Sequence, residues 1–578
     1  MSDIDLRSPW PSQSEPVRVS KRGYDLIRDP LLNKGVAFTG DERERFHLNG
    51  LLPAGRVSME MQVRRNVESI ERATTALDKY LKLSALQDRN EHLYFRVLAD
   101  NLERYMPVIY TPTVAEATRN FSHVYRRSRG VWISPGCRGR MARVLRDVVG
   151  DQPVRLIVAT DNESILGIGD QGVGGMAICI GKLALYTVAA GIPPAAALPV
   201  SLDVGTDNEL LLQDEMYVGW RKPRLRGEQY DAFIEEFVEA VAEVFPQALL
   251  QWEDLRKDIA LRVADRYREQ LPSFNDDIQG TGAVALAGVL SSGRVTGTPI
   301  SQQRVVVHGA GAAGLGITRQ IKAAMRLAGL SEAECVQRVA ALDSRGLLVA
   351  DQEQRDAYKR GLAWPAEYAR ELGLGPSADR DLEAVVRAFR PTVLVGTSGQ
   401  PGCFNERIVR AMAEHCERPV VLPFSNPSDL SEALPADVLR WTDGRALVAT
   451  GSPFAPVEFG GRSVRIGQGN NVLVFPGLGL GVLLGGIRVV TDEMLTAAAF
   501  TLAGKVTDED LASGSLFPAV SRLREISAAV AAAVIANAHG APVTAMPPES
   551  LVEAVRQKMW EPRYEEYVAA TDERGDRA

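Results

Sequence analysis

The chain has 578 residues, of which 45% are hydrophobic and 24% charged, so several packed domains are possible and the length suggests roughly three or four. A net charge of -7 is spread along the chain and not gathered in basic stripes or tails, which argues against a nucleic-acid partner. The cysteines are odd in number and far apart, so we expect reduced thiols and no disulfide framework or cysteine zinc site: Cys137, Cys179, Cys335, Cys403 and Cys416.

The N-terminal part is predicted to be a disordered segment followed by helices. Residues 1–20 contain acids, prolines and serines where an export signal would need an apolar run, so we expect a cytoplasmic protein. From about residue 60 to about residue 125 the sequence has helical periodicity with charge pairs at i, i+4. This pattern predicts an all-helical N-terminal unit.

A first strand, helix and strand unit follows. Residues 154–160 predict a strand, a glycine-rich loop leads into a helix that ends near residue 190, and residues 197–204 predict the second strand. The longest apolar stretch, from Gly174 to Ile192, is interrupted by Lys182 and by several glycines. We therefore expect a buried helix there and no membrane partner.

A second unit of this kind runs from residue 304 to Asp343, through a glycine-rich turn and a helix that ends near residue 329. Short strands that alternate with helices indicate parallel sheets, so we predict an α/β fold with two α/β domains. Residues 351–380 are predicted to form an irregular surface excursion and residues 560–578 a charged tail. Further strands are predicted at 392–396, 419–425 and 446–451.

The sequence GAGAAG, with Gly309, Gly311 and Gly314, follows its strand directly and opens a helix, so its backbone amides can face a pyrophosphate at the positive end of that helix. Asp343 closes the next strand, where a carboxylate can accept a hydrogen bond from a ribose 2′-hydroxyl. The alternative is a tight turn followed by an acidic strand end. A second match, GIGDQG at 167–172, is separated from its strand by six residues, and we interpret it as a backbone turn beside the substrate.

Lys182 is the only charged residue on a predicted helix that is apolar all round. An unpaired buried ammonium costs several kcal/mol, so the lysine either pairs with a carboxylate or becomes neutral. A lysine with a lowered pKa can act as a base near neutral pH. The alternative is a structural lysine in a salt bridge.

Two acidic pairs lie downstream of Lys182. Glu253 and Asp254 follow an apolar run that predicts a buried strand, and Asp276 and Asp277 lie in FNDDIQG. Converging carboxylates repel one another unless a divalent cation joins them, and an all-oxygen ligand set favours Mg²⁺ or Mn²⁺ over zinc. An isolated acidic pair is more often a solvated loop feature, which is the alternative here.

Tyr110 follows an apolar, strand-like run and precedes a proline turn, which can hold its hydroxyl at a loop tip facing a cleft. A tyrosine in the core is the default alternative. Asn426, Asn470 and Asn471 lie in turn-forming sequences, where asparagine commonly hydrogen-bonds the backbone. Residue patterns alone do not select these three asparagines.

The chain resembles malic enzymes from about residue 20 to about residue 565, in phrases that occur in the same order and spacing: YTPTV, LGIGDQG, GKLALYT, LPVSLDVGTDN, QWEDL, FNDDIQGT, GAGAAGLGI, SNP, ATGSPF and GQGNN. The resemblance implies oxidative decarboxylation of L-malate to pyruvate and CO₂ with a nicotinamide dinucleotide and Mg²⁺ or Mn²⁺. It also implies homodimers or homotetramers.

The resemblance further implies a Rossmann-type dinucleotide-binding domain inserted in an α/β substrate domain, with a helical N-terminal domain. We place the helical domain at 21–128 and the substrate and metal-binding domain at 129–276 plus 471–541. The dinucleotide-binding domain is placed at 277–470 and a C-terminal extension at 542–578.

Carried over position by position, the resemblance makes Lys182 the general base that takes the C2 hydroxyl proton and Tyr110 the acid that later protonates the enolate. Asp276 becomes a partner that tunes Lys182. The implied metal ligands are Glu253, Asp254 and Asp277. The implied cofactor contacts are Gly309, Ala310, Gly311, Ala312, Ala313, Gly314, Asp343, Ser344 and Asn426, and the implied substrate contacts are Ser164, Asn426, Asn470 and Asn471.

The sequence departs from the family at Ser164, where malic enzymes usually carry an arginine that binds a substrate carboxylate or the cofactor. Malolactic enzymes, which retain the cofactor and yield lactate, also lack this arginine. Some segments resemble that group, but YTPTV and DVGTDN are of the malic type, so we favour oxidative decarboxylation. A malolactic enzyme is one alternative, and a catalytically silent dinucleotide-binding regulator is another, against which the retained base, acid and metal ligands argue.

The choice of dinucleotide depends on the residues that end the second strand of the dinucleotide unit. Asp343 favours the 2′-hydroxyl of NAD, whereas Ser344 and Arg345 can hold the 2′-phosphate of NADP. We expect NAD as the main cofactor, with some use of NADP.

Overall fold

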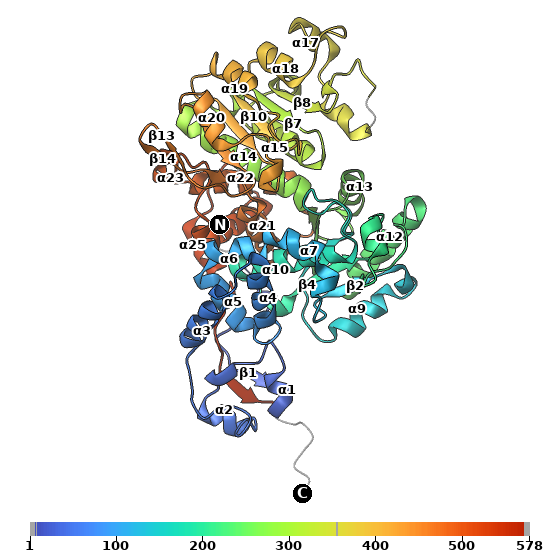
Figure 1. Ribbon diagram of the computed structural model, residues 1–578, viewed down its shortest axis with the longest axis vertical. Coiled ribbons are helices and arrows are strands. Elements are labelled where there is room, and N and C mark those ends of the chain that lie inside the picture. Colours follow the sequence, from blue (N-terminus) through green and yellow to red (C-terminus); the bar gives the residue numbers. More distant parts are fainter. Residues whose placement is uncertain (1–5, 7, 354–355, 571–578) are drawn as a thin grey trace.

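The computed structural model describes residues 6, 8–353 and 356–570. Its first α/β unit is built on a parallel five-stranded sheet, at the right of Figure 1. The strands lie in the order β2 (Val131–Ile133), β4 (Ala197–Leu202), β3 (Leu156–Thr160), β5 (Leu249–Trp252) and β6 (Ser273–Asn275). One face packs against α9 (Met141–Val149), α12 (Gly227–Val244) and α13 (Lys257–Tyr267), and the other against α10 (Met176–Ala190). Both faces are covered, which explains the continuous apolar strand sequences.

The second α/β unit, at the top of Figure 1, contains a seven-stranded sheet. Its strands lie in the order β15 (Gly467–Gln468), β12 (Leu447–Thr450), β11 (Val420–Pro423), β10 (Val393–Gly396), β7 (Val305–His308), β8 (Val339–Asp343) and β9 (Gly346–Leu347). All pairs are parallel except β8 with β9. One face packs against α14 (Thr281–Thr296) and α15 (Ala312–Leu327), and the other against α18 (Leu382–Phe389), α19 (Glu406–Ala413) and α20 (Pro435–Trp441). The predicted α/β fold is confirmed, as are the strands predicted within the two α/β units.

Apolar helices join the two units at the centre of the molecule. Helix α21 (Phe475–Leu484) packs on α24 (Leu523–Ala538) and α10, while α22 (Asp492–Lys505) packs on α14 and α24. The segment Gly172–Ala190, which includes α10, is long and apolar enough to cross a membrane by length and composition, yet 94% of it is buried inside the structure. This burial agrees with the predicted core helix.

The N-terminal region is helical, as predicted, with α1 (Gly23–Ile27), α2 (Gly40–Arg45), α3 (Met59–Glu71), α4 (Ala76–Gln87), α5 (Glu91–Asp100), α6 (Leu102–Ile109), α7 (Thr113–Arg119) and α8 (Phe121–Val124). The remaining short elements are α11 (Glu209–Gln213), α16 (Glu332–Arg338), α17 (Ala366–Glu371), α23 (Asp508–Ala512), α25 (Glu549–Arg556) and the hairpin β13 (Val457–Phe459) with β14 (Arg462–Val464).

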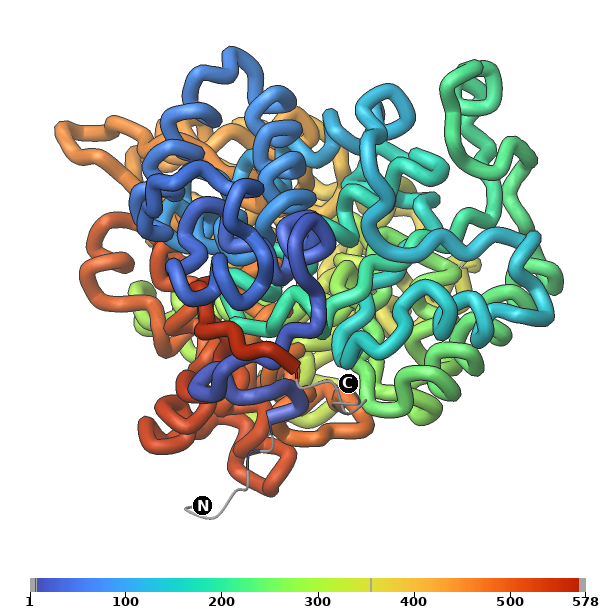
Figure 2. The backbone as a smooth tube through the Cα atoms, turned by 90° about the horizontal axis from the view of Figure 1, so that it is seen from below, coloured from blue at the N-terminus to red at the C-terminus, as the bar shows by residue number. Residues whose placement is uncertain are grey.

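Two expectations about the chain ends are wrong within the described residues. Residues Val17–Val19 form strand β1, which pairs in parallel with β16 (Tyr567–Ala569), and Trp10 is only 7% exposed. Strands β1 and β16 lie side by side (Figure 2), so each segment gains hydrogen bonds that its own sequence does not reveal. Residues 1–5, 7 and 571–578, which were also expected to be disordered or tail-like, lie outside the described residues.

The segment 351–380 is also more ordered than predicted. It contains a short 3-10 helix, η7 (Ala357–Leu362), and α17, and the side chain of Trp364 is fully buried against Phe389. Residues 354 and 355 lie outside the described residues. The polar composition of the segment concealed this apolar anchor.

Candidate active site

A cavity of about 370 Å³ lies where the two sheets meet. Its walls come from segments that follow the carboxyl ends of β3, β5, β6, β7, β10, β11 and β15, which is where open α/β sheets bind their ligands. Of the predicted site residues it brings together Tyr110, Ser164, Lys182, Glu253, Asp254, Asp277, Gly311, Ala312, Ala313, Asn426, Asn470 and Asn471. The predicted residues that do not line it are Asp276, Gly309, Ala310, Gly314, Asp343 and Ser344.

Lys182 lies in the middle of α10 with only 1% of its side chain exposed. Its Nζ donates a hydrogen bond to Oδ2 of Asp276 and lies 2.9 Å from Oε1 of Glu253. Burial opposes the ammonium form, but the carboxylates of Asp276 and Glu253 outweigh this effect and raise the pKa of Lys182 well above its usual value. The predicted carboxylate partner is present, whereas a lowered pKa is wrong for a lysine held between two carboxylates.

Three carboxylates gather beside this lysine. Glu253 and Asp254 follow β5, Asp277 lies in η5 (Asp276–Gly280) after β6, and each offers an oxygen within 4.8 Å of the other two. Gln251 Nε2 donates to Glu253 Oε2 at 2.8 Å, and the backbone amide of Asp254 donates to Asp277 Oδ2 at 2.8 Å. The backbone of Asp254 is left-handed, with φ 52°, a conformation that non-glycine residues adopt mainly where the surroundings enforce it.

The raised pKa values of the three carboxylates explain why these groups fit a cation. Burial, together with the neighbouring carboxylates, raises the pKa of Glu253 to about 8 and that of Asp277 to about 6, and raises the pKa of Asp254 well above its usual value. Oδ2 of Asp254 is buried and has no hydrogen-bond partner among the described residues. A divalent cation that prefers oxygen ligands would relieve the repulsion among the carboxylates and would give Oδ2 of Asp254 a partner.

Tyr110 caps the C-terminus of α6, so the apolar run before it is a helix and not the predicted strand. The side chain is 5% exposed and its ring centroid lies 5.5 Å from Nζ of Lys182. Burial raises the pKa of Tyr110 further above its usual value, so the hydroxyl keeps its proton at neutral pH. Tyr110 is therefore placed to donate a proton.

Asn471 links the cavity wall to the buried partner of Lys182. Its Nδ2 donates to Oδ2 of Asp276 and to Oγ1 of Thr281, each at 3.0 Å. Asp276 itself is fully buried behind Lys182, which explains why it does not line the cavity. The structure thus places Asp276 as the predicted partner of Lys182 and Asn471 as a support for it.

The glycine-rich loop follows β7 and enters α15. Gly309 has φ 118°, and a Cβ at Gly314 would lie 2.0 Å from the carbonyl oxygen of Gly309, so neither position accepts a side chain without movement. The amides of Gly309 and Ala310 donate to Leu342 O, both at 2.9 Å. The backbone amides left to face a ligand are therefore those of the first turn of α15. This set of donors is smaller than the sequence predicted.

Asp343 ends β8 and is held by two cations. Its Oδ2 lies 2.7 Å from Nζ of Lys359, and its Oδ1 accepts a hydrogen bond from the backbone amide of Arg345 at 2.8 Å. Burial opposes the charge, but hydrogen bonds from Lys359 and Arg345 lower the pKa of Asp343, so it remains a carboxylate. Sequence reasoning missed Lys359 because it assigned 351–380 to a surface excursion.

Other cavity residues were also missed. Thr281 follows FNDDIQG directly and Lys257 lies three residues after Asp254, so their place within the motifs was an available signal. Thr397 follows β10 and Ser425 follows β11, so the rule that ligands bind at the carboxyl ends of strands would have selected both. The GIGDQG turn contributes Gly167 to the lining, and Leu166 directly before it also lines the cavity.

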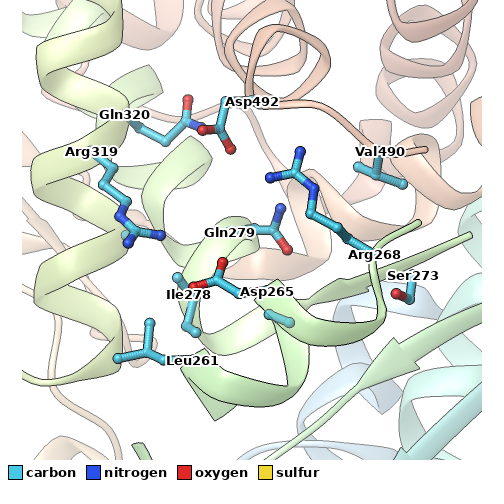
Figure 3. Close-up of a pocket in the computed structure, with 12 residues that line it drawn as sticks. Leu261, Asp265, Arg268, Ser273, Ile278, Gln279, Arg319, Gln320, Val490 and Asp492 are labelled. Atoms are coloured by element: carbon cyan, nitrogen blue, oxygen red, sulfur yellow. The ribbon is translucent and has the colours of Figure 1, made fainter. Parts of the chain in front are cut away.

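A second, smaller pocket of about 60 Å³ lies against Ile278 and Gln279 of η5 (Figure 3). Charged side chains line it, and none of the following forms an ion pair with another described residue: Asp265, Arg268, Arg319 and Asp492. This pocket was not predicted from the sequence.

Comparisons with known proteins show which family the chain resembles. A family model described as "Malic enzyme, N-terminal domain" matches residues 87–268, and one described as "Malic enzyme, NAD binding domain" matches residues 278–539. The chain is 46% identical to the NAD-dependent malic enzyme of Sodalis glossinidius over 554 residues, which cover 96% of this chain and 98% of that protein.

The chain belongs to the malic enzyme family.

Other malic enzymes are also similar to the chain, in sequence or in structure. NAD-dependent malic enzyme 3 of Bacillus subtilis is 45% identical over 550 residues, which cover 95% of this chain and 97% of that protein. The crystal structure of the malic enzyme of Entamoeba histolytica matches with a TM-score of 0.53 at 20% identity, covering 90% of this chain and 92% of that chain. That of Pyrococcus horikoshii matches with a TM-score of 0.51 at 23% identity, covering 79% of this chain and 89% of that chain. These two structural matches support the fold.

Proposed function

We propose that the chain is an NAD-dependent malic enzyme that oxidises L-malate and releases CO₂ to leave pyruvate. The observation that carries this proposal is the meeting of Lys182, Tyr110 and three carboxylates in one cavity that also reaches the dinucleotide loop. The names of the curated relatives, which are NAD-dependent malic enzymes, favour NAD as the cofactor.

Glu253, Asp254 and Asp277 are the proposed ligands of Mg²⁺ or Mn²⁺. When bound, the cation would polarise the C2 oxygen of malate and withdraw electrons as the C4 carboxylate leaves. The fit rests on the raised pKa values and on the unpartnered oxygen of Asp254.

Lys182 is the proposed general base, which accepts the proton of the C2 hydroxyl at Nζ. Two carboxylates hold it as an ammonium, so the role requires that their effect be reduced. If a cation neutralises the charge of Glu253, Asp276 is the one of these two carboxylates that still stabilises the ammonium form of Lys182. Burial then favours the neutral amine. Asp276 then orients Nζ, and Asn471 orients Asp276.

Tyr110 is the proposed acid that protonates C3 of the enol left after CO₂ departs. Its buried hydroxyl stays protonated, and its ring lies beside Lys182, which can return a proton to it. NAD supplies the hydride acceptor. Ser164, Asn426, Asn470 and Asn471 are the proposed substrate contacts.

The proposed cofactor contacts are Gly309, Ala310, Gly311, Ala312, Ala313, Gly314, Asp343, Ser344 and Asn426. Those that do not line the cavity act in two ways. Gly309 and Gly314 shape the turn, and Asp343 accepts from the ribose. Because Asp343 sits between two cations, some use of NADP also remains part of the proposal.

The domain division given above, a homodimer or homotetramer, and a cytoplasmic location complete the proposal. The division into a substrate unit at 129–276 plus 471–541 and a dinucleotide unit at 277–470 is supported by the two separate sheets. Size-exclusion chromatography with light scattering would test the oligomer.

The function is tested by following NADH absorbance after L-malate, Mn²⁺ and NAD are added to the purified protein. Accumulation of NADH with pyruvate supports the proposal. Lactate without NADH would favour the malolactic alternative, which Ser164 motivates, and no turnover would favour the silent regulator.

A further inference from the structure

The cavity contains an unusual distribution of positive charge for a site that takes a dicarboxylate. Among its described lining residues the cations are Lys182 and Lys257. Lys182 is buried and already engaged by Asp276 and Glu253, so it has little capacity to bind a substrate carboxylate. Ser164, at the position where the family arginine is expected, is neutral.

Lys257 follows Glu253 and Asp254 closely in the chain and lines the same cavity. It is the first residue of α13, which begins three residues after Asp254 and lies between the two α/β units (Figure 1). The backbone amide of Ser164 donates to the carbonyl of Asp254 at 3.0 Å, so Ser164 adjoins the same loop. Lys257 and Ser164, which stands where the family arginine is expected, therefore both adjoin the loop that contains Asp254.

The side chain of Lys257 is free to change partner. It is 48% exposed, and its ion pair among the described residues is a long one, 3.4 Å from Nζ to Oδ2 of Asp356. Asp356 lies nearer to Lys359, at 3.2 Å, so losing Lys257 would not leave it unpaired. An exposed ion pair of this kind contributes little to the stability of the protein. A carboxylate inside the cavity, by contrast, offers Lys257 a charge-assisted hydrogen bond.

We propose that Lys257 binds a carboxylate of the substrate and so takes over the part of the arginine that Ser164 replaces. The inference rests on the proposed function for the identity of the dicarboxylate, L-malate. A dinucleotide phosphate is the competing ligand, because Gly311 and Ala312 line the same cavity. The connection of Lys257 to the Glu253 and Asp254 loop favours the substrate.

The test compares Lys257→Gln and Lys257→Arg with the wild type. Loss of a charge-assisted hydrogen bond predicts that Lys257→Gln raises KM for malate about 10- to 100-fold, with kcat and KM for NAD changed less than about threefold. Lys257→Arg should retain most of the affinity. Adding Ser164→Arg to Lys257→Gln should recover part of it, which a purely structural role of Lys257 would not predict.

Arg256→Gln is the matched control, because Arg256 precedes Lys257 but does not line the cavity and pairs with Asp258. It should leave KM for malate unchanged. An unchanged KM for malate in Lys257→Gln, or a rise in KM for NAD instead, would overturn the proposal.

Calorimetric titration of L-malate into the Mn²⁺-loaded protein separates this proposal from the proposed function. If the wild type binds malate without turning it over, the function fails, and weaker binding by Lys257→Gln still supports the role of Lys257. If the wild type does not bind malate at all, both proposals are overturned.

Discussion

Lys182 and Glu253 form a buried ion pair, with 2.9 Å between Nζ and Oε1, that joins the middle of α10 to the carboxyl end of β5. Glu253 also belongs to the three-carboxylate cluster, so the proposed base and the proposed metal ligands share one side chain. Any cation bound by the cluster therefore changes the electrostatic surroundings of Lys182 directly.

Lys182→Met should lower kcat by a factor of about 10² to 10⁴, because the C2 hydroxyl loses its proton acceptor. Lys182→Arg should be nearly as inactive, since a guanidinium keeps its proton, although it restores the positive charge beside Asp276. Steady-state rates and NAD binding by fluorescence would be measured for both. An arginine variant with wild-type kcat would exclude Lys182 as the base.

Tyr110→Phe should leave malate oxidation possible but remove enzymatic protonation of C3. We expect kcat to fall by a factor of about 10² to 10⁴ and the pyruvate formed in D₂O, from malate stereospecifically tritiated at C3, to carry a methyl group of mixed configuration. The phenyl ring preserves the packing next to Lys182, so Tm should hardly change. Stereospecific deuteration by the variant would contradict the proposed role.

The metal site should stabilise the protein more at pH 8 than at pH 6. Burial and neighbouring charges raise the folded-state pKa of Glu253 to about 8 and of Asp277 to about 6. Because these values exceed the unfolded ones, the chain without a cation loses stability as pH rises from about 4 toward 8, while proton competition for the ligands weakens over the same range.

Saturating Mn²⁺ should therefore raise Tm by about 2–5 °C at pH 8 and by less at pH 6, as differential scanning calorimetry can measure. Asp277→Asn, which removes one ligand charge, should lose most of the rise. An equal rise at both pH values, or in the variant, would show that the ion binds elsewhere.

Asp343→Ser should shift the cofactor preference toward NADP. The substitution removes the acceptor for the 2′-hydroxyl of NAD and frees Lys359 and Arg345 to contact a 2′-phosphate. We expect the ratio of kcat/KM for NAD to that for NADP to fall at least about tenfold. Asp351→Asn, which removes a carboxylate that pairs with Arg380, is the control, and an unchanged ratio in Asp343→Ser would remove Asp343 from the cofactor site.

Local patterns predicted most of the α/β framework and much of the cavity. The strands and Lys182 were accessible because burial leaves a direct mark on composition, and the carboxyl-end rule places the acidic pairs after β5 and β6. The roles of Tyr110 and the asparagines came only from the family resemblance, since tyrosine and asparagine in such sequences usually have structural roles.

What the sequence could not predict depends on long-range contacts. β1 exists because it pairs with β16, some 550 residues away in the chain. Lys359 contacts Asp343 from a segment that also carries the buried Trp364. The direction of the pKa shift of Lys182 depended on how closely Asp276 and Glu253 approach it, which no spacing in the sequence reveals.

Product analysis with one equivalent of NAD per site and excess L-malate is the sharpest test of oxidative decarboxylation at Lys182 and the carboxylate cluster. Oxidative decarboxylation should give one pyruvate and one NADH per site, after which the reaction stops because the oxidised cofactor is consumed. Continued formation of lactate from that single equivalent, with no net NADH, would contradict it.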